Sequence, residues 1–104
     1  MKTLHLSIKK PYFDAIRRGA KTTEYRTMSD YWMRKIVDLS EYKGKTLDEI
    51  REGLVMGKLK LHYIPYDTLI FHCQNLTYEI GMKKVEVYRG HETFAIKLSE
   101  AYTS

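Results

Sequence analysis

The chain lacks several features that mark whole classes of protein. It holds a single cysteine, Cys73, so no disulfide can form within it and no pair of thiols is present for zinc or redox chemistry. No apolar run approaches the roughly 20 residues that a membrane-spanning helix needs. The first residues enter an alternating pattern rather than the apolar core of a signal peptide. These absences predict a soluble, cytoplasmic protein with no membrane segment and no cofactor.

Histidine is also sparse and shows no metal-ligand spacing. His72 directly precedes Cys73, but neighbouring residues of a strand point to opposite faces. His5, His62 and His91 are scattered along the sequence. We therefore expect no metal site, and no pair of histidines suited to acid–base cleavage of RNA.

The length of the chain limits the number of domains, and its charge indicates the kind of partner. With 104 residues, 43% of them hydrophobic, the chain can bury one modest core but not two, and no segment repeats internally. We therefore expect a single domain over residues 1–104. Basic residues outnumber acidic ones, giving a net charge of +5 and a pI near 9.3. This excess favours an anionic partner, with nucleic acid the first candidate.

Hydrophobic patterning predicts an α+β fold. Apolar side chains alternate as they do in half-buried strands, and the predicted strands cover residues 4–8, 22–26, 69–73, 85–87 and 94–98. Helices are predicted at about 10–18, after Ser29 as an N-cap, and after Thr46, which forms a capping-box pattern with Glu49. Five strands interrupted by helices without regular alternation favour a small barrel over a doubly wound sheet.

The segment GAKTTEYR, residues 19–26, concentrates polar chemistry where a helix turns into a strand. Gly19 suits the left-handed conformation just past a helix end, and Lys21 falls at the bend. Alternation divides the strand residues between two sides: Thr22, Glu24 and Arg26 on one, Thr23 and Tyr25 on the other.

The opening LHLSIKKPYFDAIRRGAKTTEYR resembles the start of an ASCH domain, in which a strand and a helix precede a G-x-K-T-x-E-x-R signature. The resemblance continues in SDYWMRKI, as in phage-type and lactic-bacterial members, and in YDTLIFHC, MKKVEVYR and TFAIKL. The segment at about 39–64 has no counterpart and is interpreted as a helical insertion.

The resemblance implies a small β-barrel of the PUA-like superfamily, with about five to six strands and two to three short helices. ASCH domains are expected to act on RNA or nucleosides in a cleft beside the helix-to-strand junction. One bacterial branch hydrolyses N4-acetylcytidine with the lysine of the G-x-K-T motif, a threonine three residues later and a distant glutamate. Lys21 matches that lysine, Glu24 occupies the threonine's place, and no position here aligns with the glutamate.

The signature residues support two kinds of chemistry. As a binding site, Lys21 and Arg26 can hold a phosphate or a base carbonyl while Glu24 accepts from an exocyclic amine. As a catalytic site, Lys21 can act as a base with Glu24 assisting. A third interpretation is a solvated ion-pair cluster of little energetic value. The predicted flanking contacts are Thr22, Thr23, Tyr25 and Trp32, although Trp32 could instead belong to the core.

Three functions remain open at this point. The first is an RNA- or nucleoside-binding ASCH domain. The second is an amidohydrolase that converts N4-acetylcytidine, or a related N4-acylcytidine, to cytidine. The third is a protein-interaction module in which residues 46–60 of the insertion dock a partner.

Overall fold

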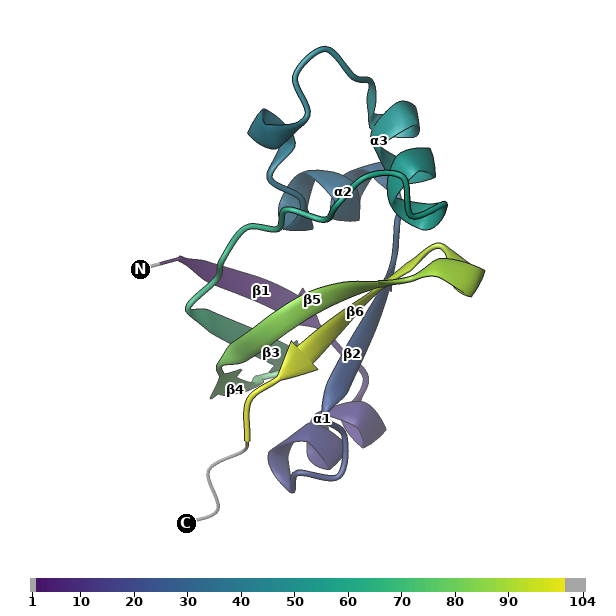
Figure 1. Cartoon of the computed structure of the whole chain (residues 1–104). Coiled ribbons are helices and arrows are strands. Elements are labelled where there is room, and N and C mark those ends of the chain that lie inside the picture. The colour runs from purple at the N-terminus through teal and green to yellow at the C-terminus, as the bar shows by residue number, and fades with distance from the viewer. Residues whose placement is uncertain (1, 101–104) are drawn as a thin grey trace. The chain divides into compact units, whose positions relative to one another are not determined.

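A computed structural model describes residues 2–100 as a small α+β fold (Figure 1). Its three helices are α1 (Lys10–Arg17), α2 (Asp30–Ile36) and α3 (Leu47–Val55). Its six strands are β1 (Thr3–Ser7), β2 (Thr23–Thr27), β3 (Thr68–Cys73), β4 (Leu76–Ile80), β5 (Met82–Tyr88) and β6 (Thr93–Leu98). Two short 3-10 turns, η1 (Leu39–Glu41) and η2 (Arg89–His91), complete it. The strands form two three-stranded sheets, ordered β1-β3-β4 and β2-β6-β5. The predicted α+β class is confirmed.

The described residues group into two compact units. The first unit contains residues 2–24, 65–84 and 97–100, and the second contains residues 25–64 and 85–96. The prediction of a single domain stays a prediction.

The sheet β1-β3-β4 belongs to the first unit and follows the alternation read from the sequence. β1 and β3 run parallel with Leu4 opposite Leu69 and Leu6 opposite Phe71, while β3 and β4 run antiparallel. These four apolar side chains are buried. The predicted core faces of the first and third strands are therefore confirmed.

Helix α1 begins and ends where its proline and glycine predict. Pro11 lies in its first turn, where a missing backbone N–H costs nothing. Gly19 adopts φ +78°, its N–H donates to the carbonyl of Ile16, and Ala20 N–H donates to the carbonyl of Ala15, which together form a Schellman C-cap. Phe13 and Ile16 are buried, and α1 lies against β3.

Strand β4 is absent from the five strands that the sequence predicts. β3 turns into β4 through Gln74 and Asn75, with Gln74 at φ +56°. The signal was present, because Leu76, Tyr78 and Ile80 alternate with polar residues directly after Asn75. A second, smaller difference is that β2 starts one residue later than the predicted 22–26.

Both helices of the second unit are capped as predicted. The Ser29 side chain accepts from the N–H of Trp32 at 3.3 Å. Thr46 and Glu49 form a reciprocal capping box at the start of α3, which confirms the predicted helix in the 39–64 segment. Helices α2 and α3 contact each other within this unit (Figure 1). Their inward faces bury Met33, Ile36, Ile50 and Leu54.

The two ends of the 39–64 segment are held together by hydrogen bonds. Asp38 N–H donates to the carbonyl of His62 at 2.9 Å, and Ile64 N–H donates to the carbonyl of Ile36 at 2.8 Å. The buried Tyr42 hydroxyl donates to the carbonyl of Lys60 at 2.6 Å and accepts from the N–H of His62 at 2.7 Å. The segment therefore returns to its starting point. Within residues 2–100, no helix has the length and apolar character to cross a bilayer.

Candidate functional site

The C-cap of α1 positions Lys21. The N–H of Lys21 donates to the carbonyl of Ala15 at 3.1 Å, immediately after the Schellman turn at Gly19. The carbonyl of Thr22 then accepts from Leu98 N–H at 3.0 Å, which joins this bend to the end of β6. Lys21 is thus fixed at the junction between α1 and β2, as the sequence predicts.

Lys21 and Glu24 form an ion pair with little access to water. The Nζ atom of Lys21 lies 3.3 Å from Oε1 of Glu24, and their side chains are 20% and 8% exposed. The same Nζ donates to the carbonyl of Thr23 at 2.8 Å. It also lies 5.6 Å from the ring centroid of Tyr12, within reach of a cation–π contact. The Lys21 ammonium is therefore held by several partners rather than by one.

Burial distinguishes this pair from ordinary surface ion pairs. Within residues 2–100, Glu24 is the one polar or charged residue that is buried. Lys10 and Asp14, also in the first unit, lie at a similar 3.2 Å but are 52% and 40% exposed. Withdrawing two charges from water costs free energy that their attraction does not always repay. The solvated-cluster interpretation therefore fits Lys10 and Asp14 but not Lys21 and Glu24.

Arg26 and Trp32 form a separate contact in the second unit. The guanidinium carbon of Arg26 lies 5.0 Å from the centroid of the Trp32 ring. Tyr31 meets the same ring edge-on at 5.0 Å, and Lys35 lies 5.7 Å from the Tyr31 ring. Trp32 is half-buried, so it is neither a full core residue nor a free surface platform. Of the predicted site residues, the structure thus pairs Lys21 with Glu24 and Arg26 with Trp32.

The remaining signature residues lie on the other side of β2 or at its start. Thr22 is exposed. The Thr23 hydroxyl accepts from Nζ of Lys97 at 3.4 Å, and the Tyr25 ring meets Tyr88 edge-on. The sequence did not predict that Lys97 and Tyr12 contact the signature residues. The one signal for Lys97 is the alternation of TFAIKL, which places it on the side of the strand opposite the apolar residues.

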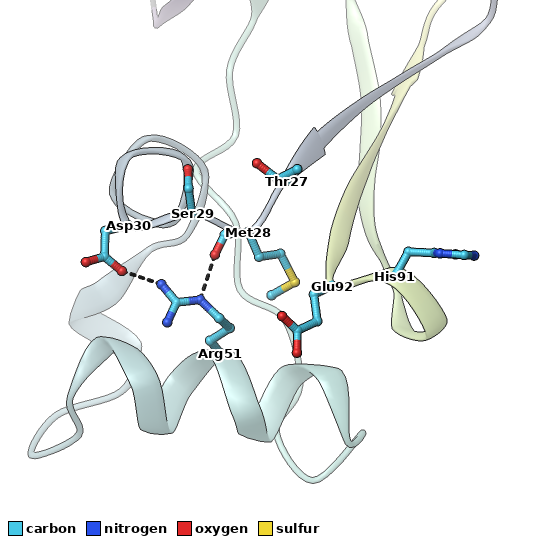
Figure 2. A pocket seen from close by; sticks show the side chains of 7 residues that line it. All are labelled: Thr27, Met28, Ser29, Asp30, Arg51, His91 and Glu92. Atoms are coloured by element: carbon cyan, nitrogen blue, oxygen red, sulfur yellow. Dashed lines mark hydrogen bonds and ion pairs between the residues drawn. The ribbon is translucent and has the colours of Figure 1, made fainter.

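The pocket around Arg51 is a structural junction rather than a second ligand site (Figure 2). This cavity of about 500 Å³ lies in the second unit and is lined by Thr27, Met28, Ser29, Asp30, Arg51, His91 and Glu92. Figure 2 shows Arg51 reaching from α3 toward Asp30 and the Met28 carbonyl. Its Nε donates to that carbonyl at 2.6 Å, and its terminal nitrogens pair with Asp30 and Asp48. The bond to Asp30, followed by the bond to Asp48, raises the pKa of Arg51. The bonds to Asp30 and to the Met28 carbonyl hold α3 in place.

Part of the surface of residues 46–60 therefore packs within their own unit and is not exposed. Ile50 and Leu54 are buried, whereas Met56 just past the helix is exposed. Gly53 makes room for Leu59, since a Cβ there would lie 2.5 Å from Cδ1 of that side chain. Docking of a partner protein on this segment stays a prediction.

Two of the histidines that look scattered in the sequence meet in the first unit. Nδ1 of His5 and Nε2 of His72 are 2.7 Å apart, because β1 and β3 are adjacent and parallel. No group of three or more histidine, cysteine or acidic side chains suited to a metal occurs in the described part of the chain.

Comparison with known proteins gives no relative, since no protein-family model, curated protein or solved structure matches the chain. The Lys21–Glu24 ion pair, with its carboxylate buried, lies at the junction that the sequence singles out.

Proposed function

We propose that the chain is a cytoplasmic ASCH-type domain with a PUA-like barrel fold, and that it binds RNA or a nucleoside-like ligand at the Lys21–Glu24 pair. The observation that carries the proposal is the 3.3 Å ion pair between the part-buried Lys21 ammonium and the buried Glu24 carboxylate. A buried ion pair adds little to the stability of a fold, because the cost of desolvating its charges offsets their attraction. We therefore infer that this pair serves recognition of a ligand.

The pair complements the polar edge of a nucleobase. A carboxylate accepts hydrogen bonds and a lysine ammonium only donates them. Glu24 suits an exocyclic amine, in the way that acidic residues accept from the amino group of cytosine. Lys21 suits a ring nitrogen or carbonyl oxygen on the same edge. A base that offers an amine beside an acceptor, as cytosine does, fits this donor and acceptor pair best.

Within the second unit, Arg26 and Trp32 are suited to a phosphate and to a base of RNA. A guanidinium can bind a phosphate through two nitrogens at once, and an indole ring can stack on a base. Thr22 and Thr23 complete the proposed contacts of the Lys21–Glu24 site along the signature.

Binding of a nucleoside and of RNA tests the proposal. Calorimetric titration with cytidine is expected to give heat for the wild-type protein and to lose most of it in Lys21→Ala and Glu24→Gln. Lys10→Ala is the matched control, because it removes an exposed ion pair of similar length from the same unit. RNA affinity is expected to fall as salt rises, since counterions are released from the phosphates. Normal binding by the Lys21→Ala and Glu24→Gln proteins would rule out this site.

Amide hydrolysis of N4-acetylcytidine is the second candidate, favoured by the same short Nζ to Oε1 distance. Water would add its oxygen to the acyl carbon, the C–N bond would break, and the exocyclic amine would take a proton as acetate leaves. Lys21 and Glu24 are close enough to pass that proton between them. Incubation with N4-acetylcytidine decides the matter: no cytidine, or cytidine formed equally by Lys21→Ala, would exclude hydrolysis by this pair.

A further inference from the structure

Three aromatic rings from separate elements meet on the surface of the second unit. Tyr25 comes from β2, Tyr88 from the end of β5 and His91 from η2. The Tyr25 and Tyr88 rings meet edge-on at 6.2 Å and 82° between planes, whereas Tyr88 and His91 are stacked at 4.8 Å and 22°. Together with Thr93 of the central strand β6, they line an open hollow of about 410 Å³. We call these four residues the aromatic hollow.

The aromatic hollow is not part of the hydrophobic core. Tyr25 and Tyr88 are 51% and 49% exposed, and His91 is also exposed. Along β2, Tyr25 directly follows the buried Glu24, and neighbouring residues of a strand point to opposite sides. Aromatic rings that stay accessible and share one hollow are typical of surfaces that stack ligands.

Local hydrogen bonds hold the backbone of the η2 turn, which carries His91. The Thr93 hydroxyl donates to the carbonyl of His91 at 2.8 Å, and Glu92 takes the left-handed conformation at φ +46°. The carbonyl of Glu92 accepts from Met28 N–H at 3.0 Å, which ties the η2 turn to the end of β2. Figure 2 shows the His91 ring pointing away from Arg51. The turn therefore presents His91 to Tyr88 in a fixed position.

We propose that the aromatic hollow stacks an unpaired nucleobase of single-stranded RNA. Its volume lies within the range of about 300 to 1,000 Å³ that small-molecule sites occupy. An exposed ring on a strand stacks a base of any identity, because every base has a π-face. The net charge of +5 favours the accompanying phosphates.

A protein partner fits the aromatic hollow less well. A stable protein interface buries about 800 Å² on each partner and needs about 20 residues a side, whereas this hollow is lined by four. The lining side chains also carry polar groups that suit the edges of a base. These are two phenol hydroxyls, an imidazole and the Thr93 hydroxyl.

This inference goes beyond the binding proposed at Lys21 and Glu24, and it does not depend on that site. It predicts a contact with RNA that a free nucleoside bound at the ion pair would not make. It also predicts that RNA with exposed bases binds and that a fully paired duplex does not compete, because stacked bases in a duplex are not accessible.

Fluorescence anisotropy with a labelled oligouridine of about ten nucleotides tests the inference, since stacking tolerates any base. Tyr88→Ala and Tyr25→Ala are each expected to weaken binding about 5-fold or more, because stacking contributes about 1 to 3 kcal/mol per base. Tyr88→Phe, which keeps the ring, is expected to bind as the wild type does. The slope of affinity against salt is expected to stay unchanged in all three, since no phosphate contact is removed.

Controls separate this outcome from failure of the proposed function. Met56→Ala removes an exposed side chain of the same unit outside the hollow and is expected to leave oligouridine affinity unchanged. Cytidine titration of Tyr88→Ala, followed by the amide resonances of residues 21–24, reports on the Lys21–Glu24 site and is expected to match the wild type. Thermal unfolding of each variant checks that it is folded. Wild-type affinity in both alanine variants, or no oligouridine binding by the wild-type protein, would overturn the inference whatever the cytidine result.

Discussion

The Lys21 ammonium and the Glu24 carboxylate lie 3.3 Å apart with the carboxylate almost fully out of water. The helix-to-strand junction produces this relationship, because the C-cap at Gly19 fixes the bend and β2 carries Glu24 inward. Lys21 also donates to the Thr23 carbonyl, so its position is set by two acceptors. Substitutions in this pair are therefore expected to change both the free energy of unfolding and the binding of a ligand.

Removing one member of the pair is expected to destabilise the fold. Lys21→Ala leaves the Glu24 carboxylate buried without its ammonium, and we expect a loss of about 1.5 to 3 kcal/mol of unfolding free energy. Replacing both residues, as Lys21→Met with Glu24→Leu, is expected to recover most of that loss. Urea unfolding measures these differences.

The exposed pair of Lys10 and Asp14 supplies the control. Lys10→Ala is expected to change the unfolding free energy by less than about 1 kcal/mol, as exposed ion pairs do. Equal losses for Lys10→Ala and Lys21→Ala would show that burial does not distinguish the two pairs.

Arg51 is expected to hold α3 to the rest of its unit. Arg51→Ala removes the bonds to Met28, Asp30 and Asp48, and we expect amide hydrogen exchange in α3 to become faster while β1 and β3 stay protected. Arg51→Lys is expected to restore little, because an ammonium cannot reproduce the planar fork. Arg34→Ala, an exposed change on α2, is the control. Unchanged exchange in α3 would contradict this role.

Tyr42 is expected to stabilise the return of the 39–64 segment. Tyr42→Phe leaves the carbonyl of Lys60 and the N–H of His62 without their partner, which is expected to cost about 1 to 3 kcal/mol. Chemical unfolding of both proteins at neutral pH measures the loss. A change below about 0.5 kcal/mol, the size of an ordinary surface substitution, would contradict it.

The same residue predicts a dependence on pH. Burial raises the pKa of the Tyr42 phenol above its ordinary value of 10.0, and the His62 N–H acts in the opposite direction. Because the folded pKa is the higher one, the contribution is fully present below pH 10.0 and is lost as the pH rises through the folded pKa. Tyr42→Phe is expected to show less loss of stability at alkaline pH than the wild type. Identical alkaline profiles would contradict the burial of the phenol.

Trp32 provides a built-in reporter, since the chain holds one tryptophan. Arg26→Ala removes the guanidinium over its ring and uncovers it to water. We expect the fluorescence emission of Trp32 to shift to longer wavelength in this variant. Lys43→Ala, which changes an exposed lysine away from Trp32 in sequence, is expected to leave the spectrum unchanged. An unshifted spectrum in Arg26→Ala would contradict the contact.

Local signals predict the elements of this fold well. Pro11 and Gly19 mark both ends of α1, and Thr46 with Glu49 marks the start of α3, because capping depends on residues that are close in sequence. Strand β4 could also have been predicted from its alternation. The location of the Lys21–Glu24 pair follows for the same reason, since its members are three residues apart.

Contacts that depend on strand pairing could not be predicted. His5 meets His72 only because β1 and β3 pair in parallel, and no local pattern gives that register. Tyr25 and Tyr88 likewise meet only because β2 and β5 flank β6. The half-burial of Trp32, intermediate between the core and stacking interpretations, is also set by packing rather than by its helical spacing.

The most direct test of the central claim is a titration of the isotope-labelled protein with cytidine, followed by its amide resonances. Binding at the ion pair predicts saturable shifts centred on residues 21–24, shifts that Lys21→Ala and Glu24→Gln abolish and Lys10→Ala preserves. Saturable shifts elsewhere with residues 21–24 unmoved, or no shifts at all, would contradict it.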